Sequence, residues 1–99
     1  MDAIRYEWDE TKRIKNLAKH GIEFEAILRF DWSMSVSGPD RRVTYGEERI
    51  VAFAPIDGRL HATVYTTRGD IRRIISLRKA NRREQASYAA AVLARLARR

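Results

Sequence analysis

The sequence predicts an α+β fold in which helices pack against an antiparallel sheet. Three observations support this class. Short runs alternate apolar and polar residues, longer stretches have helical periodicity, and Asp-Gly and Gly-Asp pairs separate the later runs. Alternation is typical of half-buried strands, and the two-residue pairs are typical of hairpin turns. The expected order of elements is β-α-α-β-β-β-β-α, with the helices grouped against one sheet.

The first third of the chain predicts one strand and two helices. Residues 4–8 alternate as a strand does, and Trp8 at its end is expected in the core. Asp9 is a typical cap for a helix that reaches His20 and stops at Gly21. The core-facing stripe of this helix is expected to be Ile14, Leu17 and Ala18. A second short helix is expected over residues 23–30, with three apolar residues packed inward: Phe24, Ile27 and Leu28.

The rest of the chain predicts four strands and a final helix. The strands are expected at residues 33–37, 49–55, 60–67 and 71–77, with a turn at 38–40 and an exposed loop to Gly46. Asn81 followed by Glu84 is a capping-box pattern, which predicts a helix to about Ala97. Four of its residues are expected to face inward: Ala86, Ala89, Leu93 and Leu96.

Length and composition narrow the class of protein. A chain of 99 residues predicts one domain over residues 1–99. The absence of cysteine excludes a disulfide framework, a thiol nucleophile and thiolate zinc sites. No apolar run approaches the roughly 18 residues of a membrane span, and the N-terminus is acidic where a signal peptide is basic. The expected location is therefore the cytoplasm.

The charge of the chain is concentrated in its last third. The net charge is +7, yet residues 1–67 hold ten basic and eleven acidic residues. Residues 68–99 hold ten basic residues, nine of them arginine, and only two acidic ones. Arginine pairs bidentately with phosphate and stacks on bases, so this segment favours a polyanion, most often nucleic acid. A solubilising surface or a docking face for an acidic protein is the alternative.

One face of the helix over residues 10–20 is unusually polar. At about 100° per residue, Asp9, Asn16 and His20 fall within about 40° of one another, flanked by Lys12 and Lys19. A solvated face is one interpretation. The other is that a lysine and a titratable imidazole at the helix end take part in proton transfer. The helix C-terminus is expected to favour the protonated form of His20.

The strands over residues 60–67 and 71–77 predict a polar sheet face. The first strand carries four residues on a face too polar for core burial: His61, Thr63, Tyr65 and Thr67. In the second, Arg72, Ser76 and Arg78 are expected to share a face, with Arg73 on the opposite one. Tyrosine stacks on bases and arginine holds phosphate, which suits an RNA platform. An exposed face of good strand formers is the alternative.

The sequence lacks the residue patterns that most other types of catalysis require. There are only two histidines, no HExxH pattern and no glycine-rich phosphate loop, so neither a metal nor another cofactor is expected. Metal-free RNA cleavage remains. In it a base deprotonates the 2′-hydroxyl, which attacks the adjacent phosphate, an acid protonates the leaving 5′-oxygen, and cations stabilise the phosphorane.

Two sequence blocks resemble a known family. They are WDxxKxxxNxxKHG at residues 8–21 and RIISxRxA at residues 73–80. Both are similar to the BrnT family, the ribonuclease toxins of type II toxin–antitoxin systems. Further matching residues lie between and after the blocks: Phe24-Glu25, Phe30-Asp31, residues 46–49, Gly58-Arg59, residues 64–66, Arg68-Gly69, Glu84 and Tyr88.

The resemblance implies a compact RelE-like fold and a metal-independent endoribonuclease that inhibits translation. It also implies neutralisation by a BrnA-type antitoxin, through which the complex binds operator DNA. The catalytic residues carried over are Lys19, His20, Tyr65, Arg68 and Arg78. Among them, His20 or Tyr65 would transfer protons, and Arg68 and Arg78 would hold phosphate. The RNA-binding residues are expected to be Lys12, Arg72, Arg73 and Lys79. A non-catalytic RNA-binding or corepressor module is the alternative.

Overall fold

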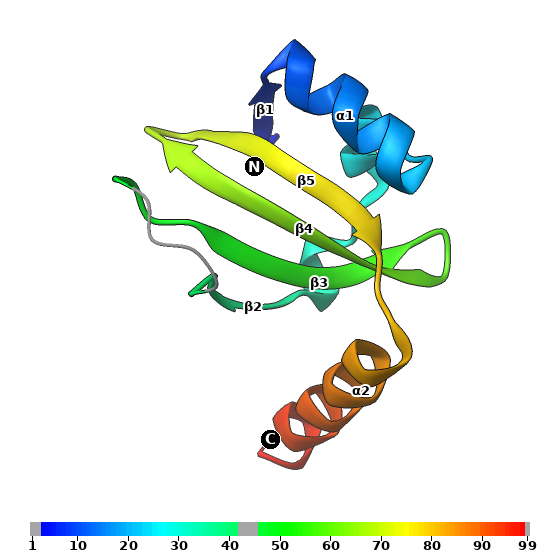
Figure 1. Ribbon diagram of the computed structural model, residues 1–99. Helices are drawn as coiled ribbons and strands as arrows, with labels where there is room; N and C mark the ends of the chain where they lie inside the picture. The colour runs from blue at the N-terminus through cyan, green and yellow to red at the C-terminus, as the bar shows by residue number, and fades with distance from the viewer. Residues whose placement is uncertain (1–2, 42–45, 99) are drawn as a thin grey trace.

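A five-stranded mixed sheet forms the centre of the molecule (Figure 1). The computed structural model describes residues 3–41 and 46–98. The strands are β1 (Arg5–Trp8), β2 (Val36–Pro39), β3 (Ile50–Ile56), β4 (Arg59–Arg68) and β5 (Ile71–Lys79), in the spatial order β1-β5-β4-β3-β2. The pairing of β1 with β5 is parallel, so the prediction of a wholly antiparallel sheet is wrong at this strand. No hairpin joins β1 to its neighbour, so no local turn sets its direction.

Four helical segments accompany the sheet: α1 (Glu10–His20), η1 (Phe24–Arg29), η2 (Trp32–Met34) and α2 (Arg82–Ala97). The segments η1 and η2 are 3₁₀ helices, so the strand expected at residues 33–37 begins only at Val36. Gly38 and Pro39, expected in a turn, belong to β2. The loop expected to reach Gly46 includes residues 42–45, which lie outside the described residues. No helix within the described ranges is long and apolar enough to cross a membrane.

Capping signals place the helix ends as the sequence predicts. The Asp9 side chain accepts a hydrogen bond from the backbone N–H of Lys12, and Gly21 ends α1 with a φ of 71°. Asn81 and Glu84 form a complete capping box at the start of α2. These motifs involve only residues a few positions apart, so the sequence alone contains them.

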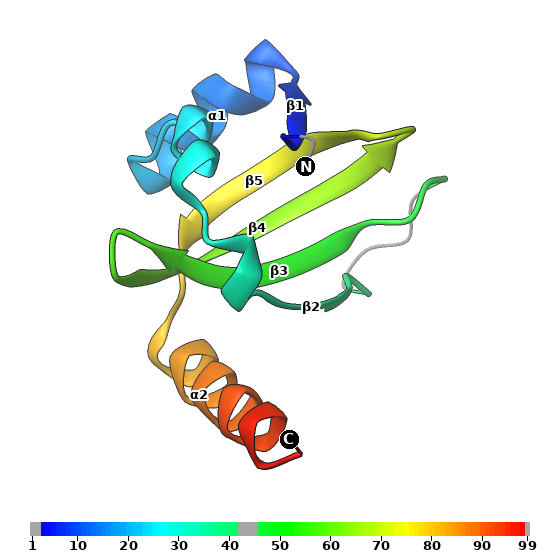
Figure 2. The same cartoon turned by 180° about the vertical axis from the view of Figure 1, so that it is seen from behind.

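The core lies between one face of the sheet and η1, and Figure 2 views the molecule from this side. We call this the covered face; it carries Ala52, Ala54, Tyr65, Ile74 and Leu77. From η1, Phe24 and Ile27 are fully buried against it, whereas Leu28, also expected inside, is 69% exposed. Trp8 packs edge-on against Phe24 with ring centroids 5.9 Å apart, as expected of a core residue.

Helix α1 attaches to the sheet through Asn16 rather than through an apolar stripe. Its side-chain Nδ2 donates to the carbonyl of Leu77 at 2.8 Å, and its Oδ1 accepts from the Leu77 N–H at 3.1 Å. β1 ends opposite Ile74, so the Leu77 edge of β5 lies beyond the β1 ladder. The amide of Asn16 takes the place of a strand peptide there. Ile14, Leu17 and Ala18 are exposed, so the predicted inward stripe is wrong.

A β-bulge in β5 reverses the predicted faces of two arginines. Val64 pairs with Ser76 but Tyr65 pairs with Ile74, which leaves Ile75 as an extra residue. Arg73 and Arg78 therefore lie on the same face of the sheet, which we call the open face. Arg72 lies on the covered face, so its predicted grouping with Ser76 and Arg78 is wrong. The prediction assumed that side chains alternate strictly between the two faces along this strand, and the extra residue interrupts that alternation.

The face of β4 judged too polar for burial is mostly buried. His61, Thr63 and Tyr65 all lie in the interior, and only Thr67 is exposed. Burial is tolerated because the polar groups find partners. The Thr63 hydroxyl donates to the Ser76 carbonyl at 2.9 Å, and His61 Nδ1 lies 2.6 Å from the Arg59 carbonyl.

Acid is expected to destabilise the protein through His61. Burial lowers the pKa of His61 below its ordinary 6.5, with the charges of Arg59 and Lys79 acting in the same direction. Below about pH 6.5 the unfolded chain therefore binds more protons than the folded one, and stability falls until the folded pKa is passed. Urea unfolding between pH 7.5 and 5 measures this loss. His61→Gln is expected to show a smaller loss than wild type; an identical pH dependence would contradict the assignment.

Helix α2 does not bury the face that the sequence predicts. Ala86, Ala89, Leu93 and Leu96 are all exposed, with Leu93 at 67%. The helix is instead held by polar contacts. The Tyr88 hydroxyl donates to the Met34 carbonyl at 2.5 Å, and Arg95 Nη2 donates to the Ser35 carbonyl at 3.0 Å. Figures 1 and 2 both show α2 standing away from α1 and the sheet.

Candidate functional site

Three of the predicted catalytic residues gather where the end of α1 meets the end of β5. Because Asn16 binds the backbone of Leu77, the last turn of α1 lies beside the next residue of β5. That turn carries Lys19 and His20, and the next residue of β5 is Arg78. The charges of Lys19 and Arg78 both act on the His20 imidazole.

The environment of His20 favours its neutral form. Burial is the largest cause that lowers its pKa below the ordinary 6.5, followed by the positive charges of Lys19 and Arg78. The net pKa shift of His20 is thus opposite to the protonated form that the helix C-terminus alone was expected to favour. Desolvation and two nearby positive charges both disfavour the imidazolium. At neutral pH the ring is mainly an acceptor of protons, which is what a general base requires.

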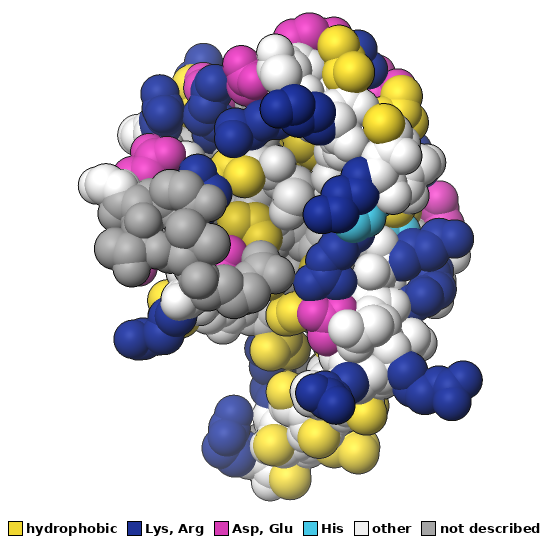
Figure 3. Space-filling model, in the orientation of Figure 1, with side chains coloured by type: hydrophobic (Ala, Val, Ile, Leu, Met, Phe, Trp, Pro, Cys, Tyr) yellow, Lys and Arg dark blue, Asp and Glu magenta, His cyan; other side chains and the backbone are white. Residues whose placement is uncertain are grey.

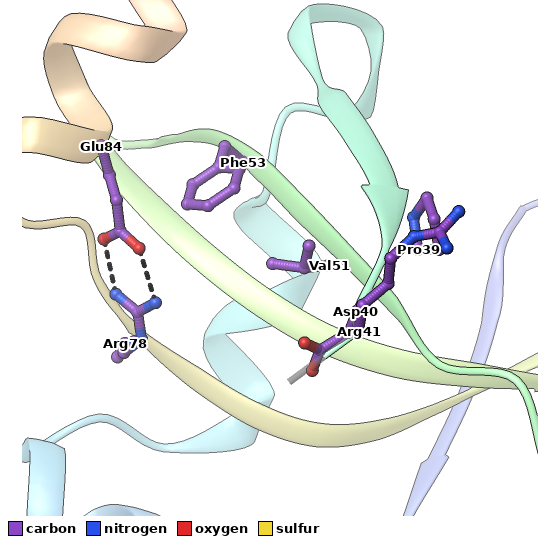
Figure 4. Close-up of a pocket in the computed structure, with 7 residues that line it drawn as sticks. All are labelled: Pro39, Asp40, Arg41, Val51, Phe53, Arg78 and Glu84. Carbon is purple, nitrogen blue, oxygen red and sulfur yellow. Dashed lines mark hydrogen bonds and ion pairs between the residues drawn. The ribbon is translucent and has the colours of Figure 1, made fainter. Parts of the chain in front are cut away.

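Arg78 lies on the open face and is held by Glu84 of α2. Its Nη1 and Nη2 donate to the two carboxylate oxygens at 2.7 and 2.8 Å, and both side chains are partly buried (Figure 4). Glu84 also accepts from the backbone N–H of Asn81 within the capping box. The carboxylate thus presents Arg78 with two acceptor oxygens, as a phosphate would.

A cleft of about 440 Å³ opens beside this pair. Val51 and Phe53 of β3 provide apolar surface in it, Arg78 and Glu84 lie on one side, and residues 39–41 lie on the other (Figure 4). Figure 3 views the open face, where hydrophobic side chains lie within a hollow and Lys and Arg side chains lie around it. An aromatic ring beside a guanidinium suits a nucleotide, whose base stacks while its phosphate pairs.

Arg73 adds a second guanidinium to the open face. It pairs with Thr66 in the register of β4 and β5, two rungs from the pair of Val64 and Ser76. Its Nη1 donates to Glu7 of β1, and both side chains are partly exposed. The position agrees with the predicted contact to RNA, while that role itself stays a prediction.

Tyr65 and Arg72 lie on the covered face, across the sheet from Arg78. The Tyr65 side chain is 6% exposed and meets Trp32 edge-on, with ring centroids 5.4 Å apart. The Arg72 guanidinium lies over the Trp32 ring at 4.1 Å and over the Tyr65 ring at 5.2 Å. The structure therefore does not bring Tyr65 to His20 and Arg78, and its predicted proton transfer stays untested.

The other predicted residues are dispersed. Arg68 lies six residues along β4 from Ala62, the partner of Arg78, which is roughly 20 Å at the usual rise of a strand. It contacts Glu47 at 3.6 Å. Lys12 is exposed in α1, and Lys79 follows Arg78 but pairs with His61 of the covered face. Their roles in catalysis and RNA binding remain predictions.

Sequence reasoning missed the contributions of Glu84 and Phe53. Glu84 carried a signal as a capping residue and as part of the family resemblance, but neither signal indicates a contact with Arg78. That pairing depends on how α2 leaves the sheet. Phe53 gave no signal beyond strand alternation. Within residues 3–41 and 46–98, no three His, Asp or Glu side chains gather as a metal site requires.

Comparison with known proteins identifies the family. No curated protein matches the chain. The family model described as ribonuclease toxin, BrnT, of type II toxin-antitoxin system matches residues 8–84. This segment includes α1, the whole of β3 to β5 and Glu84. It therefore contains Lys19, His20 and Arg78. Because the match spans most of the chain, this protein belongs to the BrnT family of type II toxin–antitoxin ribonuclease toxins.

Proposed function

We propose that this chain is a metal-independent endoribonuclease whose active site consists of Lys19, His20 and Arg78 beside the cleft on the open face. The observation that carries the proposal is the juxtaposition of a histidine of lowered pKa with an arginine at the rim of that cleft. Each residue type has a role in cleavage by the 2′-hydroxyl, and the family is one of ribonucleases.

In this proposal the neutral imidazole of His20 accepts the proton of the 2′-hydroxyl. The deprotonated oxygen attacks the adjacent phosphorus, the bond to the 5′-oxygen breaks, and water protonates that oxygen as it leaves, while His20 returns its proton to the solvent. Arg78 and Lys19 stabilise the additional negative charge of the phosphorane. General base catalysis contributes on the order of 10²–10⁴-fold, and preorganised cations contribute a comparable factor. Phe53 offers a surface on which a neighbouring base stacks.

The cellular role that we propose follows from the family. A type II system pairs the toxin with a protein antitoxin. We propose that the antitoxin is BrnA-type and binds DNA, that free toxin inhibits translation by cutting RNA, and that the fold is RelE-like. The positive charge of residues 68–99 supports an RNA substrate.

Cleavage of an end-labelled RNA by the purified, antitoxin-free chain in EDTA tests this function. Discrete products are expected in EDTA, with a rate that rises with pH up to the lowered pKa of His20 and then levels off. His20→Gln is expected to remove this pH dependence. Salt-sensitive RNA binding without products would instead favour a non-catalytic module.

Glu84→Gln is expected to strengthen RNA binding. A carboxylate competes with phosphate for the Arg78 guanidinium, whereas a neutral amide competes less. Glutamine still completes a capping box, so the start of α2 is retained. We expect the KM for RNA to fall by about three- to tenfold, since a charge-assisted pair is replaced by a neutral contact. An increase in KM would indicate that Glu84 positions Arg78 rather than competing for it.

A further inference from the structure

An apolar groove of about 570 Å³ runs between α2 and the body of the molecule. Its α2 side is a continuous helical stripe, composed of Gln85, Tyr88, Ala89, Val92 and Leu93. Its opposite side comes from η2 and the hairpin of β3 and β4, including Met34, Pro55 and Leu60. Leu96, 51% exposed, continues the stripe toward the C-terminus.

Nothing within the described chain covers this groove. The large exposed apolar side chains of the described chain include Leu93, Leu96 and Met34. Helix α2 has no buried residue and is held by the hydrogen bonds of Tyr88 and Arg95 to backbone carbonyls. Exposed apolar surface of this kind, bordered by polar residues, is typical of a protein interface. The family match ends at Glu84, so nearly all of α2 lies beyond it.

The charge around the groove indicates what occupies it. Helix α2 contains three arginines and a single acid, Glu84, which is paired with Arg78. Arg98 follows the helix, and Arg59 lines the groove itself. Figure 3 shows hydrophobic side chains along α2 with Lys and Arg side chains beside them. A second copy of this chain would place like charges against one another, whereas an acidic segment would complement them.

We propose that the groove between α2 and the β3–β4 hairpin is the docking site of the antitoxin, for an amphipathic segment with apolar side chains and acidic flanks. The inference rests on the proposed antitoxin partner and names the surface that it uses. The apolar side chains fill the space beside Leu93, and the acidic ones pair with the arginines of α2. Neither Lys19 nor His20 lines the groove, so a substitution in it is not expected to change RNA cleavage by the antitoxin-free chain.

Leu93→Asp tests this surface, with Leu28→Asp as the matched control. Both leucines are largely exposed, at 67% and 69%, so neither change disrupts the core. The candidate antitoxin for this test is the purified protein encoded by the reading frame that neighbours the gene of this chain. Its binding to each full-length variant is measured by calorimetry. Leu93→Asp is expected to raise Kd on the order of tenfold or more, because it removes an apolar contact and repels acidic groups. Leu28→Asp is expected to bind as wild type does.

Further measurements separate this inference from the proposed function. Wild-type binding is expected to weaken with salt, and both variants are expected to cleave RNA at the wild-type rate when free of antitoxin. Unchanged Kd for Leu93→Asp would overturn the groove assignment, as would loss of its RNA cleavage. Self-association of wild type that Leu93→Asp abolishes would assign the groove to a second copy. If wild type fails to bind the neighbouring product at all, the proposed partner itself is wrong, and the groove assignment falls with it.

Discussion

Replacing Arg78 with alanine is expected to reduce kcat/KM for RNA by about 10²–10³-fold, the effect of removing one preorganised donor from a transition state. Arg78 lies at the rim of the cleft, and its charge acts on His20. Its loss would remove stabilisation of the phosphorane. It would also relieve one cause of the lowered His20 pKa, so the pH profile of cleavage is expected to shift upward.

Arg29→Ala is the matched control for this change. Arg29 is also an arginine paired with a carboxylate, Asp57 at 3.0 Å, but it belongs to η1 on the covered side of the sheet. We expect Arg29→Ala to cleave RNA as wild type does. Both variants are compared at equal folded fraction, checked by thermal unfolding. Similar activity of the two variants would show that Arg78 is not part of the active site.

Asn16→Ala is expected to lower the free energy of unfolding by about 2–5 kcal/mol, the cost of leaving buried polar groups unpaired. The substitution deprives both the N–H and the carbonyl of Leu77 of their partner, and Leu77 is fully buried. It also removes the 3.2 Å bond to the Ile22 carbonyl, which holds the chain after α1. We expect weaker cleavage as well, because α1 positions His20.

Urea unfolding of Asn16→Ala and of Lys15→Ala measures this contribution. Lys15 is the exposed neighbour of Asn16 on the same helix, so its replacement changes helix propensity without touching the sheet. The control is expected to stay within about 0.5 kcal/mol of wild type. A loss below about 1 kcal/mol for Asn16→Ala would mean that the amide does not act as the missing strand.

Local signals explain which parts of the fold the sequence predicts. Asp9, Gly21 and the pair of Asn81 and Glu84 define helix ends through contacts within a few residues. The Asp57-Gly58 turn is equally local, with φ of 50° and 81° at the two residues, as a tight hairpin requires. Such features are complete within a short window of sequence.

Contacts between distant segments explain what the sequence does not predict. The Asn16 amide meets Leu77 across 61 positions, and no periodicity distinguishes this inward asparagine from a solvated one. The bulge at Ile75 inverts the faces of Arg72 and Arg73 relative to a regular strand. Arg78 pairs with Ala62 and Tyr65 pairs with Ile74, so Tyr65 and Arg78 lie on different faces of the sheet. The residues of the predicted site are therefore divided between the two faces.

For helix α2, the sequence indicates an apolar face but not what covers it. Its apolar stripe predicts burial, and the pattern itself is present in Leu93 and Leu96. The body of the molecule does not cover that stripe, which instead borders the groove. A periodic apolar face indicates that a surface is to be buried, without indicating whether the same chain or a partner buries it.

In the mechanism that we propose, His20 and Arg78 promote attack by a ribose 2′-hydroxyl without a metal. Its most direct test compares, in EDTA, one RNA oligonucleotide with the same oligonucleotide carrying a single 2′-deoxy residue on the 5′ side of the mapped cleavage position. We predict that the all-ribose strand gives a 2′,3′-cyclic phosphate and a 5′-hydroxyl end, and that the deoxy strand remains intact at that position. Cleavage of the deoxy strand, or products with a 5′-phosphate, would contradict this mechanism.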